Sequence, residues 1–205
     1  MPKPLLLVST NDFKFDEIRK ILAGYGAKLE QKKTELDEPD LKSLEEIALA
    51  KARHAYSLAK KPLIVEDTGV FFDALPGFPG TKAKRAWLEL GYEGLFKKLE
   101  GKDRSARFKS VICLMNSPMD YRFFAGELKG RILEKVVQPD ARRLPYEKIF
   151  EPDGRNKALV EFSVEEKNAF SHRAVAARKL GEYLAKTQGQ QAKQGGKNKS
   201  GKAKK

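Results

Sequence analysis

The stretch Leu5-Leu-Leu-Val8, followed by Ser9-Thr-Asn11 and by residues 14–22, decides the fold class of this 205-residue chain. The four apolar residues predict a buried strand. The residues after the polar turn predict a helix, because apolar side chains recur there at helical spacing, at Phe15, Ile18, Ile21 and Leu22. A strand that enters a helix through a short polar turn is typical of an α/β chain.

The rest of the chain continues this pattern, with a pair of strands in its middle. Residues 33–42 predict a loop, and Ser43 with Glu46 forms a capping box for a helix that runs to about Lys60. Leu63-Ile-Val65 predicts a second buried strand. Further along we expect a helix over 82–99 interrupted by Gly91 and Gly94, a hairpin of strands 108–115 and 121–128, a weaker strand over 132–137, a short helix capped by Ser163, and a longer one from Ser171 to about Lys186. This order predicts a mixed sheet.

Composition divides the chain into one domain, residues 1–186, and a Lys-rich tail, residues 187–205. The domain is long enough for one sizeable core. The tail holds six lysines, no acidic residue and no aromatic residue, which predicts disorder. The formal net charge is +13, and it falls to +7 without the tail lysines. The remaining charge either suits a polyanionic ligand or serves solubility, and we expect at most weak nucleic-acid contact from the tail.

The sequence argues against a membrane protein and against a disulfide-stapled one. No apolar run approaches the ~20 residues that a membrane helix needs. The N-terminus lacks a secretory pattern. The single cysteine, Cys113, excludes an internal disulfide and a cysteine metal cluster, and its apolar surroundings predict a buried, inert thiol. We therefore expect a soluble protein of the reducing cytoplasm.

The first polar turn is a candidate phosphate site. Ser9 and Asn11 lie where a strand feeds a helix, and such helix N-termini attract phosphate. Lys14 falls in the first helical turn, where the helix dipole disfavours a cation unless an anion is bound. The alternative is an ordinary N-cap with a solvated lysine, because the glycines of a P-loop are missing.

Two adjacent carboxylates, Glu66 and Asp67, follow the second apolar strand. Ligands of open α/β sheets bind at the carboxyl ends of strands, where we expect this pair to lie. One or two carboxylates with phosphate oxygens and water suit Mg²⁺, and a carboxylate there also suits activation of water. The alternative is two acids that solvate a strand end.

Lys51 falls on the apolar stripe of the helix over 43–60, four residues after Ile47 and four before Ala55. A lysine that faces the core needs an anionic partner or must lose its charge. The alternative is that its stem packs while its ammonium group reaches water.

A last cluster combines Lys167, His172 and Arg173 around the helix start at Ser171. Three potentially cationic groups at a positive helix end predict a bound anion, and Arg173 offers a planar fork for phosphate or a base carbonyl. Taken singly, they read as a solvated lysine, a packed histidine and a surface arginine. His54 lacks such a context and is expected on the surface.

Together these segments resemble the inosine triphosphate pyrophosphatase family, which removes ITP, dITP and XTP. The resemblance spans roughly residues 4–185, and the ordered set of motifs is far more specific than any one of them. The motifs are Ser-Thr-Asn-x-x-Lys at 9–14, Ser-Leu-Glu-Glu-Ile-Ala-x-x-Lys-Ala at 43–52, Val-Glu-Asp-Thr-Gly at 65–69, Ala-Leu-x-Gly-Phe-Pro-Gly at 74–80, Phe-x-Pro-Asp-Gly at 150–154, and Glu-Glu-Lys-Asn-x-x-Ser-His-Arg at 165–173.

The resemblance implies an elongated mixed central sheet with flanking helices, two lobes around an active cleft, a homodimer and Mg²⁺. It implies that water attacks a nucleoside triphosphate and that a monophosphate and pyrophosphate are released. Catalysis would fall to Asp67 and Lys51, and metal binding to Asp67, Glu66 and an acid of the 35–40 loop, for which Glu38 fits best and Asp40 next. Substrate binding would fall to Ser9, Asn11, Lys14, Thr68, Tyr146, Glu147, Lys167, His172 and Arg173.

The chain departs from the family pattern at three places. Thr10 replaces a glycine, and Thr81-Lys-Ala83 follows Pro-Gly where the family commonly has Tyr-Ser. In the segment 143–150, Leu144 replaces the aromatic residue that stacks on the purine, and Glu147 replaces an aspartate near the base. Tyr146, two residues further on, would substitute for the stacking residue if Pro145 turns the loop. We expect base discrimination to be weaker than the family usually shows.

Two further hypotheses belong to other classes. A nucleic-acid-binding protein would use the positive charge and the tail, but the basic residues of the domain lie beside carboxylates that a phosphate backbone repels. A nucleotide-binding protein of weakened catalysis is the second, and Asp67 with Lys51 argues against it.

Overall fold

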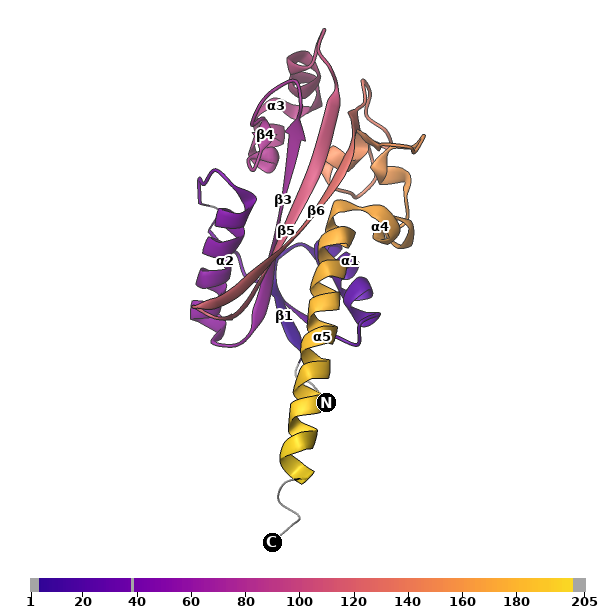
Figure 1. Cartoon of the computed structure of the whole chain (residues 1–205). Coiled ribbons are helices and arrows are strands. Elements are labelled where there is room, and N and C mark those ends of the chain that lie inside the picture. The colour runs from indigo at the N-terminus through magenta and orange to yellow at the C-terminus, as the bar shows by residue number, and fades with distance from the viewer. Residues whose placement is uncertain (1–3, 38, 201–205) are drawn as a thin grey trace.

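The chain folds around one seven-stranded mixed sheet in the strand order β2-β1-β3-β5-β6-β7, with β4 paired to β3 (Figure 1). A computed structural model describes residues 4–37 and 39–200, with side chains described to residue 190. The strands are β1 (Leu5–Val8), β2 (Leu29–Lys32), β3 (Leu63–Phe72), β4 (Pro79–Gly80), β5 (Ser105–Ser117), β6 (Asp120–Ile132) and β7 (Phe150–Pro152). The helices are α1 (Asp12–Ala23), α2 (Leu44–Ala59), α3 (Ala83–Lys98), α4 (Val164–Phe170) and α5 (His172–Ser200), with short 3₁₀ turns η1 (Pro145–Lys148) and η2 (Leu159–Glu161).

The sheet changes from parallel to antiparallel at β3. β1 runs parallel to β2 and to the first part of β3, with Leu6 and Leu7 opposite Leu63 and Ile64. β3 then continues beyond the end of β1 and pairs antiparallel with β5 along its whole length. The expected mixed sheet and the expected hairpin, β5–β6, are confirmed.

Helices cover both faces of the sheet, which explains why its central strands are apolar throughout rather than alternating. α2 packs on one face over Leu6, Leu63 and Val65. α1 and α5 pack on the other over Leu7 and Ile64 (Figure 1). Successive residues of β3 therefore face different helices.

A third apolar cluster lies at the far end of the long strands. It joins Phe72, Phe108 and Phe150 of the sheet to Leu95 of α3 and Tyr146 of η1. The core is thus built from two clusters around β1 and one around the far ends of β3 and β5, in agreement with an elongated molecule of two lobes.

Capping residues fix where the helices start, and the predicted caps are confirmed. The Asn11 side chain accepts from the backbone N–H groups of Phe13 and Lys14, 3.0 and 3.2 Å away. Capping boxes begin α2 and α4, at Ser43 with Glu46 and at Ser163 with Glu166. The helix over 82–99 is interrupted at Gly91, as expected, where φ is 60°.

The structure corrects three expected boundaries. β3 does not end at Val65 but runs to Phe72, because β5 pairs with it to Ala106. The strand expected over 132–137 is wrong, since the chain leaves the sheet after Ile132 and the N–H groups of Leu133 and Val137 bond to the Ile149 and Lys148 carbonyls instead. β7 was not expected.

The third correction concerns the tail. α5 continues to Ser200, whereas we expected the helix to end near Lys186 and residues 187–205 to be disordered. Lysine, glutamine and alanine are good helix formers, and adding residues to an established helix costs less than starting one. Residues 201–205 lie outside the described part of the chain. In that part, no helix is long and apolar enough to cross a membrane.

Close packing of α5 on β6 depends on Gly126. A Cβ atom at this position would lie 2.2 Å from the His172 carbonyl oxygen and 2.7 Å from the Ala176 nitrogen. No backbone contact can be that short, so any side chain here pushes the start of α5 away from the sheet.

We therefore expect Gly126→Ala to lower the free energy of unfolding by about 1–3 kcal/mol or more, as overpacked cores do. Urea unfolding followed by circular dichroism measures it. Gly189→Ala is the matched control, because nothing lies within 4 Å of a Cβ there, and it should leave stability unchanged or raise it by up to ~1 kcal/mol. Equal stability of Gly126→Ala and wild type would contradict the close contact.

Candidate functional site

Buried charged side chains gather where β1 ends and β3 continues. Glu66, Asp67 and Thr68 lie on this stretch of β3, and the first turn of α1 faces it with Lys14. Their position corrects the expectation of a strand end: both carboxylates lie inside β3, opposite Ile112 and Val111 of β5. They lie beyond the carboxyl end of β1, the kind of edge at which α/β sheets bind ligands.

Glu66 is the centre of the cluster on the α1 and α5 side. Its Oε2 lies 2.7 Å from the Lys14 ammonium group. Its Oε1 accepts from Thr68, Ser110 and Arg173, at 2.5, 2.6 and 3.2 Å. Burial alone would raise the pKa of Glu66, but the charges of Arg173 and Lys14 outweigh it and hold the pKa far below its usual range. Glu66 is therefore a buried anion whose Oε1 accepts three hydrogen bonds, while its Oε2 has the Lys14 ion pair and no hydrogen-bond partner among the described residues.

Arg173 and Lys167 share a second carboxylate, Glu17 of α1. Lys167 lies 2.7 Å from Glu17, and the Arg173 guanidinium group pairs with the other oxygen of the same carboxylate. Lys167 also donates to both oxygens of Glu147, at 3.1 Å each. Burial opposes ionisation of Glu17, but Arg173 and Lys167 lower its pKa to about 2. The expected cations at the start of α5 are thus neutralised within the protein.

Asp67 leaves β3 on the opposite face, toward α2. Its Oδ1 accepts from Lys51 at 2.8 Å, which confirms that the lysine on the apolar stripe of α2 has an anionic partner. Burial raises the pKa of Asp67, although Lys14 and Lys51 act against the rise. Adjacent residues on a strand point to opposite faces, so Glu66 and Asp67 do not form a side-by-side pair.

His172 is buried and neutral rather than cationic. Its ring stacks on Phe108, with centroids 4.8 Å apart. Burial, together with the nearby charge of Arg173, lowers the pKa of His172 to about 3. Neither ring nitrogen has a hydrogen-bond partner among the described residues. A neutral imidazole carries one donor and one acceptor, and the described residues leave both without a partner.

The remaining predicted site residues lie in different surroundings. Ser9 accepts from the Asn11 N–H at 3.2 Å, beside Lys14. Tyr146 is buried in the far cluster, where its hydroxyl donates to the Ala83 carbonyl at 2.9 Å and its ring meets Phe72 edge-on. Its ring face is therefore packed in the core rather than turned toward a ligand. Glu38 lies outside the described residues, and Asp40 is paired with Lys82, 2.7 Å away on the surface.

Sequence reasoning missed Glu17 and Ser110. Glu17 lies next to Ile18 and four residues before Ile21, so it flanks the apolar stripe of α1, and the argument applied to Lys51 would have found it. Ser110 alternates with Phe108 and Ile112 on one face of β5, a period-2 position that predicts burial. A buried hydroxyl needs a partner, and Glu66 supplies it.

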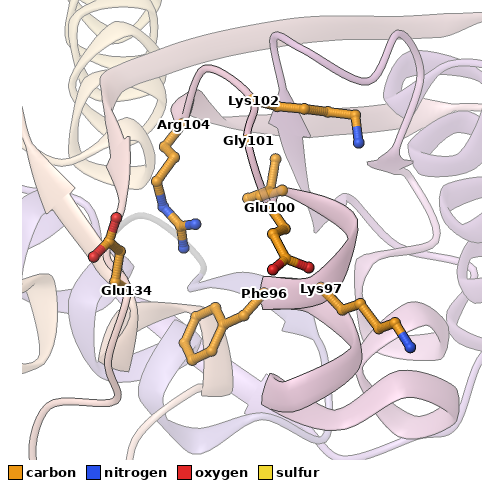
Figure 2. Close-up of a pocket in the computed structure, with 8 residues that line it drawn as sticks. Phe96, Lys97, Glu100, Gly101, Lys102, Arg104 and Glu134 are labelled. Atoms are coloured by element: carbon orange, nitrogen blue, oxygen red, sulfur yellow. The ribbon is translucent and has the colours of Figure 1, made fainter.

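A pocket of about 500 Å³ lies elsewhere, at the end of α3 (Figure 2). Arg104 in this pocket donates to the carbonyls of Ile132 and Leu133 and lies 5.6 Å over the Phe96 ring. These contacts give Arg104 a structural role, and none of the predicted site residues lines the pocket. The pocket is lined by Phe96, Lys97, Leu99, Glu100, Gly101, Lys102, Arg104 and Glu134. We therefore place the functional site at the charged cluster.

Glu17→Gln should expose the energetic role of the buried network. Because the folded-state pKa of Glu17 is lowered to about 2, its ionisation stabilises the fold above pH ~4.5, and this is lost as the pH falls toward 2. We expect the variant to be less stable by about 3 kcal/mol at pH 7 and the difference to shrink toward pH 3. Urea unfolding across this range measures it.

Glu165→Gln is the matched control. Glu165 pairs with Lys20 at 2.6 Å on the surface, where solvent screens such pairs and they contribute little to stability. A constant difference between wild type and Glu17→Gln from pH 7 to pH 3 would contradict the assigned ionisation.

Comparisons with known proteins identify the family to which the chain is similar. A profile of the Ham1 family matches residues 5–183. The chain is 38% identical to a dITP/XTP pyrophosphatase of Hyperthermus butylicus over 181 residues, 88% of this chain and 94% of that protein. It is 37% identical to an inosine triphosphate pyrophosphatase of Yarrowia lipolytica over 183 residues, 88% of this chain and 95% of the other.

The fold comparison agrees. A HAM1 protein from Coxiella burnetii superposes with a TM-score of 0.76 at 25% identity, and the match covers 90% of this chain and 100% of the other. The family resemblance that the ordered motifs indicated is confirmed. The chain belongs to the Ham1 family.

Proposed function

We propose that this protein hydrolyses non-standard purine nucleoside triphosphates, ITP, dITP and XTP, to the monophosphate and pyrophosphate, and so cleanses the nucleotide pool. The names of its relatives support the substrate class. The observation that carries the proposal is the buried pair of Asp67 and Lys51, 2.8 Å apart, at the edge where β1 ends. A buried acid and base held together on rigid elements suit chemistry at a phosphate better than binding alone.

The phosphates would lie at the start of α1. Lys14 is half-buried and near both carboxylates, since it pairs with Glu66 and its charge lowers the pKa of Asp67. A triphosphate brings negative charge that Lys14 and Lys51 can share. Ser9, Asn11 and Thr68 border the same point and supply polar groups.

Asp67 would accept the proton of the attacking water. The water oxygen bonds to the α-phosphorus, and the bond from that phosphorus to the bridging oxygen of the β-phosphate breaks. Pyrophosphate then leaves with the bonding electrons. Lys51 holds the Asp67 carboxylate in place and offsets charge that develops on the phosphate oxygens.

A magnesium ion fits Asp67 better than Glu66. Oε1 of Glu66 already accepts from three donors, and its Oε2 faces the Lys14 ammonium group, so a metal at Glu66 would have to displace Lys14 from Oε2. In the described residues no three His, Cys, Asp or Glu side chains converge on one point. A site with one or two carboxylates suits Mg²⁺, because this ion takes its other ligands from substrate phosphates and water. When bound, it would neutralise phosphate charge, and Glu38 stays the predicted second carboxylate.

The base would lie near Lys167, His172 and Arg173. Their N–H groups suit a 6-keto oxygen, the group that distinguishes inosine and xanthosine from adenosine. A homodimer, a cytoplasmic location and weak nucleic-acid contact through residues 187–205 stay predictions.

The substrate class is tested by pyrophosphate release from ITP, dITP, XTP, GTP, ATP and dUTP, with and without Mg²⁺. We expect activity only with Mg²⁺ and a higher kcat/KM on the 6-keto purines ITP, dITP, XTP and GTP than on ATP. We expect the preference over ATP to be smaller than the family usually shows, because Leu144 and Glu147 alter the segment 143–150. ATP or dUTP as the best substrate would show that this assignment is wrong.

Asp67→Asn should lower kcat by about 10²–10⁴-fold, the usual cost of losing a general base, while the protein stays folded. The substitution keeps the shape and one acceptor oxygen for Lys51. Steady-state kinetics on ITP measure the change, and circular dichroism monitors the fold. Asp120→Asn is the matched surface control and should keep wild-type activity, because the exposed Asp120 only accepts from Asn116 at 3.0 Å in the β5–β6 hairpin. A near-normal rate for Asp67→Asn would exclude the proposed role.

A further inference from the structure

Arg143, in the segment 143–150 that departs from the family pattern, lies over the ring of Phe13 at the start of α1. The Arg143 guanidinium carbon lies 5.4 Å from the centre of the Phe13 ring. Phe13 follows the Asn11 cap and precedes Lys14, and it is 38% exposed. Phe13 therefore keeps part of its ring exposed at the start of α1, although Arg143 lies over one side of the ring.

The pair spans the same two segments that hold Lys167. Phe13 lies one helical turn before Glu17, on the same side of α1. Arg143 lies four residues before Glu147, which is in η1. Glu17 and Glu147 both contact the Lys167 ammonium group, at 2.7 and 3.1 Å. The contact between Phe13 and Arg143 therefore lies next to the residues proposed to read the base.

Other aromatic rings of this region are already covered. Tyr146 is 5% exposed, with its hydroxyl bonded to Ala83. Phe108 carries His172 on its face at 4.8 Å, and Phe170 carries Arg155 at 3.7 Å. Leu144, between Arg143 and η1, is aliphatic. Phe13 also carries an arginine, but at 38% exposure it is the most exposed of these four rings.

We propose that the purine base of the substrate stacks on Phe13 and that Arg143 closes over the other face of the base. This inference rests on the proposed function and adds the residues that hold the base. A base stacked between the Phe13 ring and the Arg143 guanidinium group needs about 7 Å between them, the sum of two van der Waals contacts. The present distance is 5.4 Å, so Arg143 moves outward by roughly 2 Å when the base enters. The half-buried Arg143 is free to do so, because it makes no ion pair with the described residues.

Stacking of this kind holds the base without reading its edge. Every base has a π-face, and a purine offers more of it than a pyrimidine. Phe13 and Arg143 would therefore raise affinity for ITP, GTP and ATP together, and choice among them would stay with Lys167, His172 and Arg173.

Binding of the two products separates this role from the chemistry. Isothermal titration with IMP and with pyrophosphate is carried out on wild type, Phe13→Leu, Phe13→Trp and Arg143→Lys. Phe13→Leu keeps apolar bulk but removes the π-face, and we expect its Kd for IMP to rise about tenfold. Arg143→Lys keeps the charge but loses the plane, and we expect about threefold. Phe13→Trp should bind IMP at least as tightly as wild type, and pyrophosphate binding should not change.

Phe15→Leu is the matched control. Phe15 is on the same helix and also has an arginine over its ring, Arg19 at 5.9 Å, but it packs against the α1 and α5 cluster. Its IMP affinity should equal that of wild type. Unchanged IMP binding by Phe13→Leu, or an equal loss for pyrophosphate, would overturn the role of Phe13, and unchanged IMP binding by Arg143→Lys would overturn that of Arg143. If wild type neither binds IMP nor hydrolyses ITP, the proposed function itself is wrong and this inference falls with it.

Discussion

The buried guanidinium group of Arg173 is the constraint on which the rest of the site depends. It is 1% exposed and cannot lose its proton, so the fold must bring carboxylates to it. Glu17 comes from α1 and Glu66 from β3, two elements that the chain places on the same face of the sheet. Lys14, Lys167 and Glu147 then balance the remaining charge. Removing one member leaves an unpaired buried ion, so we expect substitutions in this network to be destabilising.

Side chains alternate along β3, so the adjacent acids Glu66 and Asp67 lie on opposite faces of the sheet and have different roles. Glu66 faces α1 and α5, where it contacts Lys14 and Arg173 and so fixes the positions of these two side chains. Asp67 faces α2, where Lys51 is its charged neighbour, and it keeps the raised pKa that burial imposes. A one-residue shift in the pairing of β3 with β5 would exchange these roles, so the long antiparallel ladder also sets the chemistry of the site.

Local signals predicted much of this arrangement. The caps at Asn11, Ser43 and Ser163 and the partner of Lys51 followed from residue type and spacing alone. The length of β3 could not be predicted in this way, because Glu66 and Asp67 become part of a strand by pairing with Ile112 and Val111 of β5, which are distant in sequence. The burial of Tyr146 depends likewise on Ala83 and Phe72, which are distant in sequence. Glu17 was missed although the rule that found Lys51 applied to it.

The state of Lys167 and His172 explains why discrimination among purines should be modest. Lys167 directs its ammonium group at Glu17 and at both oxygens of Glu147, which engages the three N–H donors that a lysine has. A 6-keto oxygen must then compete with two carboxylates for Lys167. His172 is neutral, and its nitrogens have no partner among the described residues to fix which one carries the proton. A ring that can present either a donor or an acceptor accommodates a keto group in one tautomer and an amino group in the other. Strong selection needs a site that penalises the wrong group by leaving a buried polar atom unpaired, and an imidazole free to change tautomer avoids that penalty.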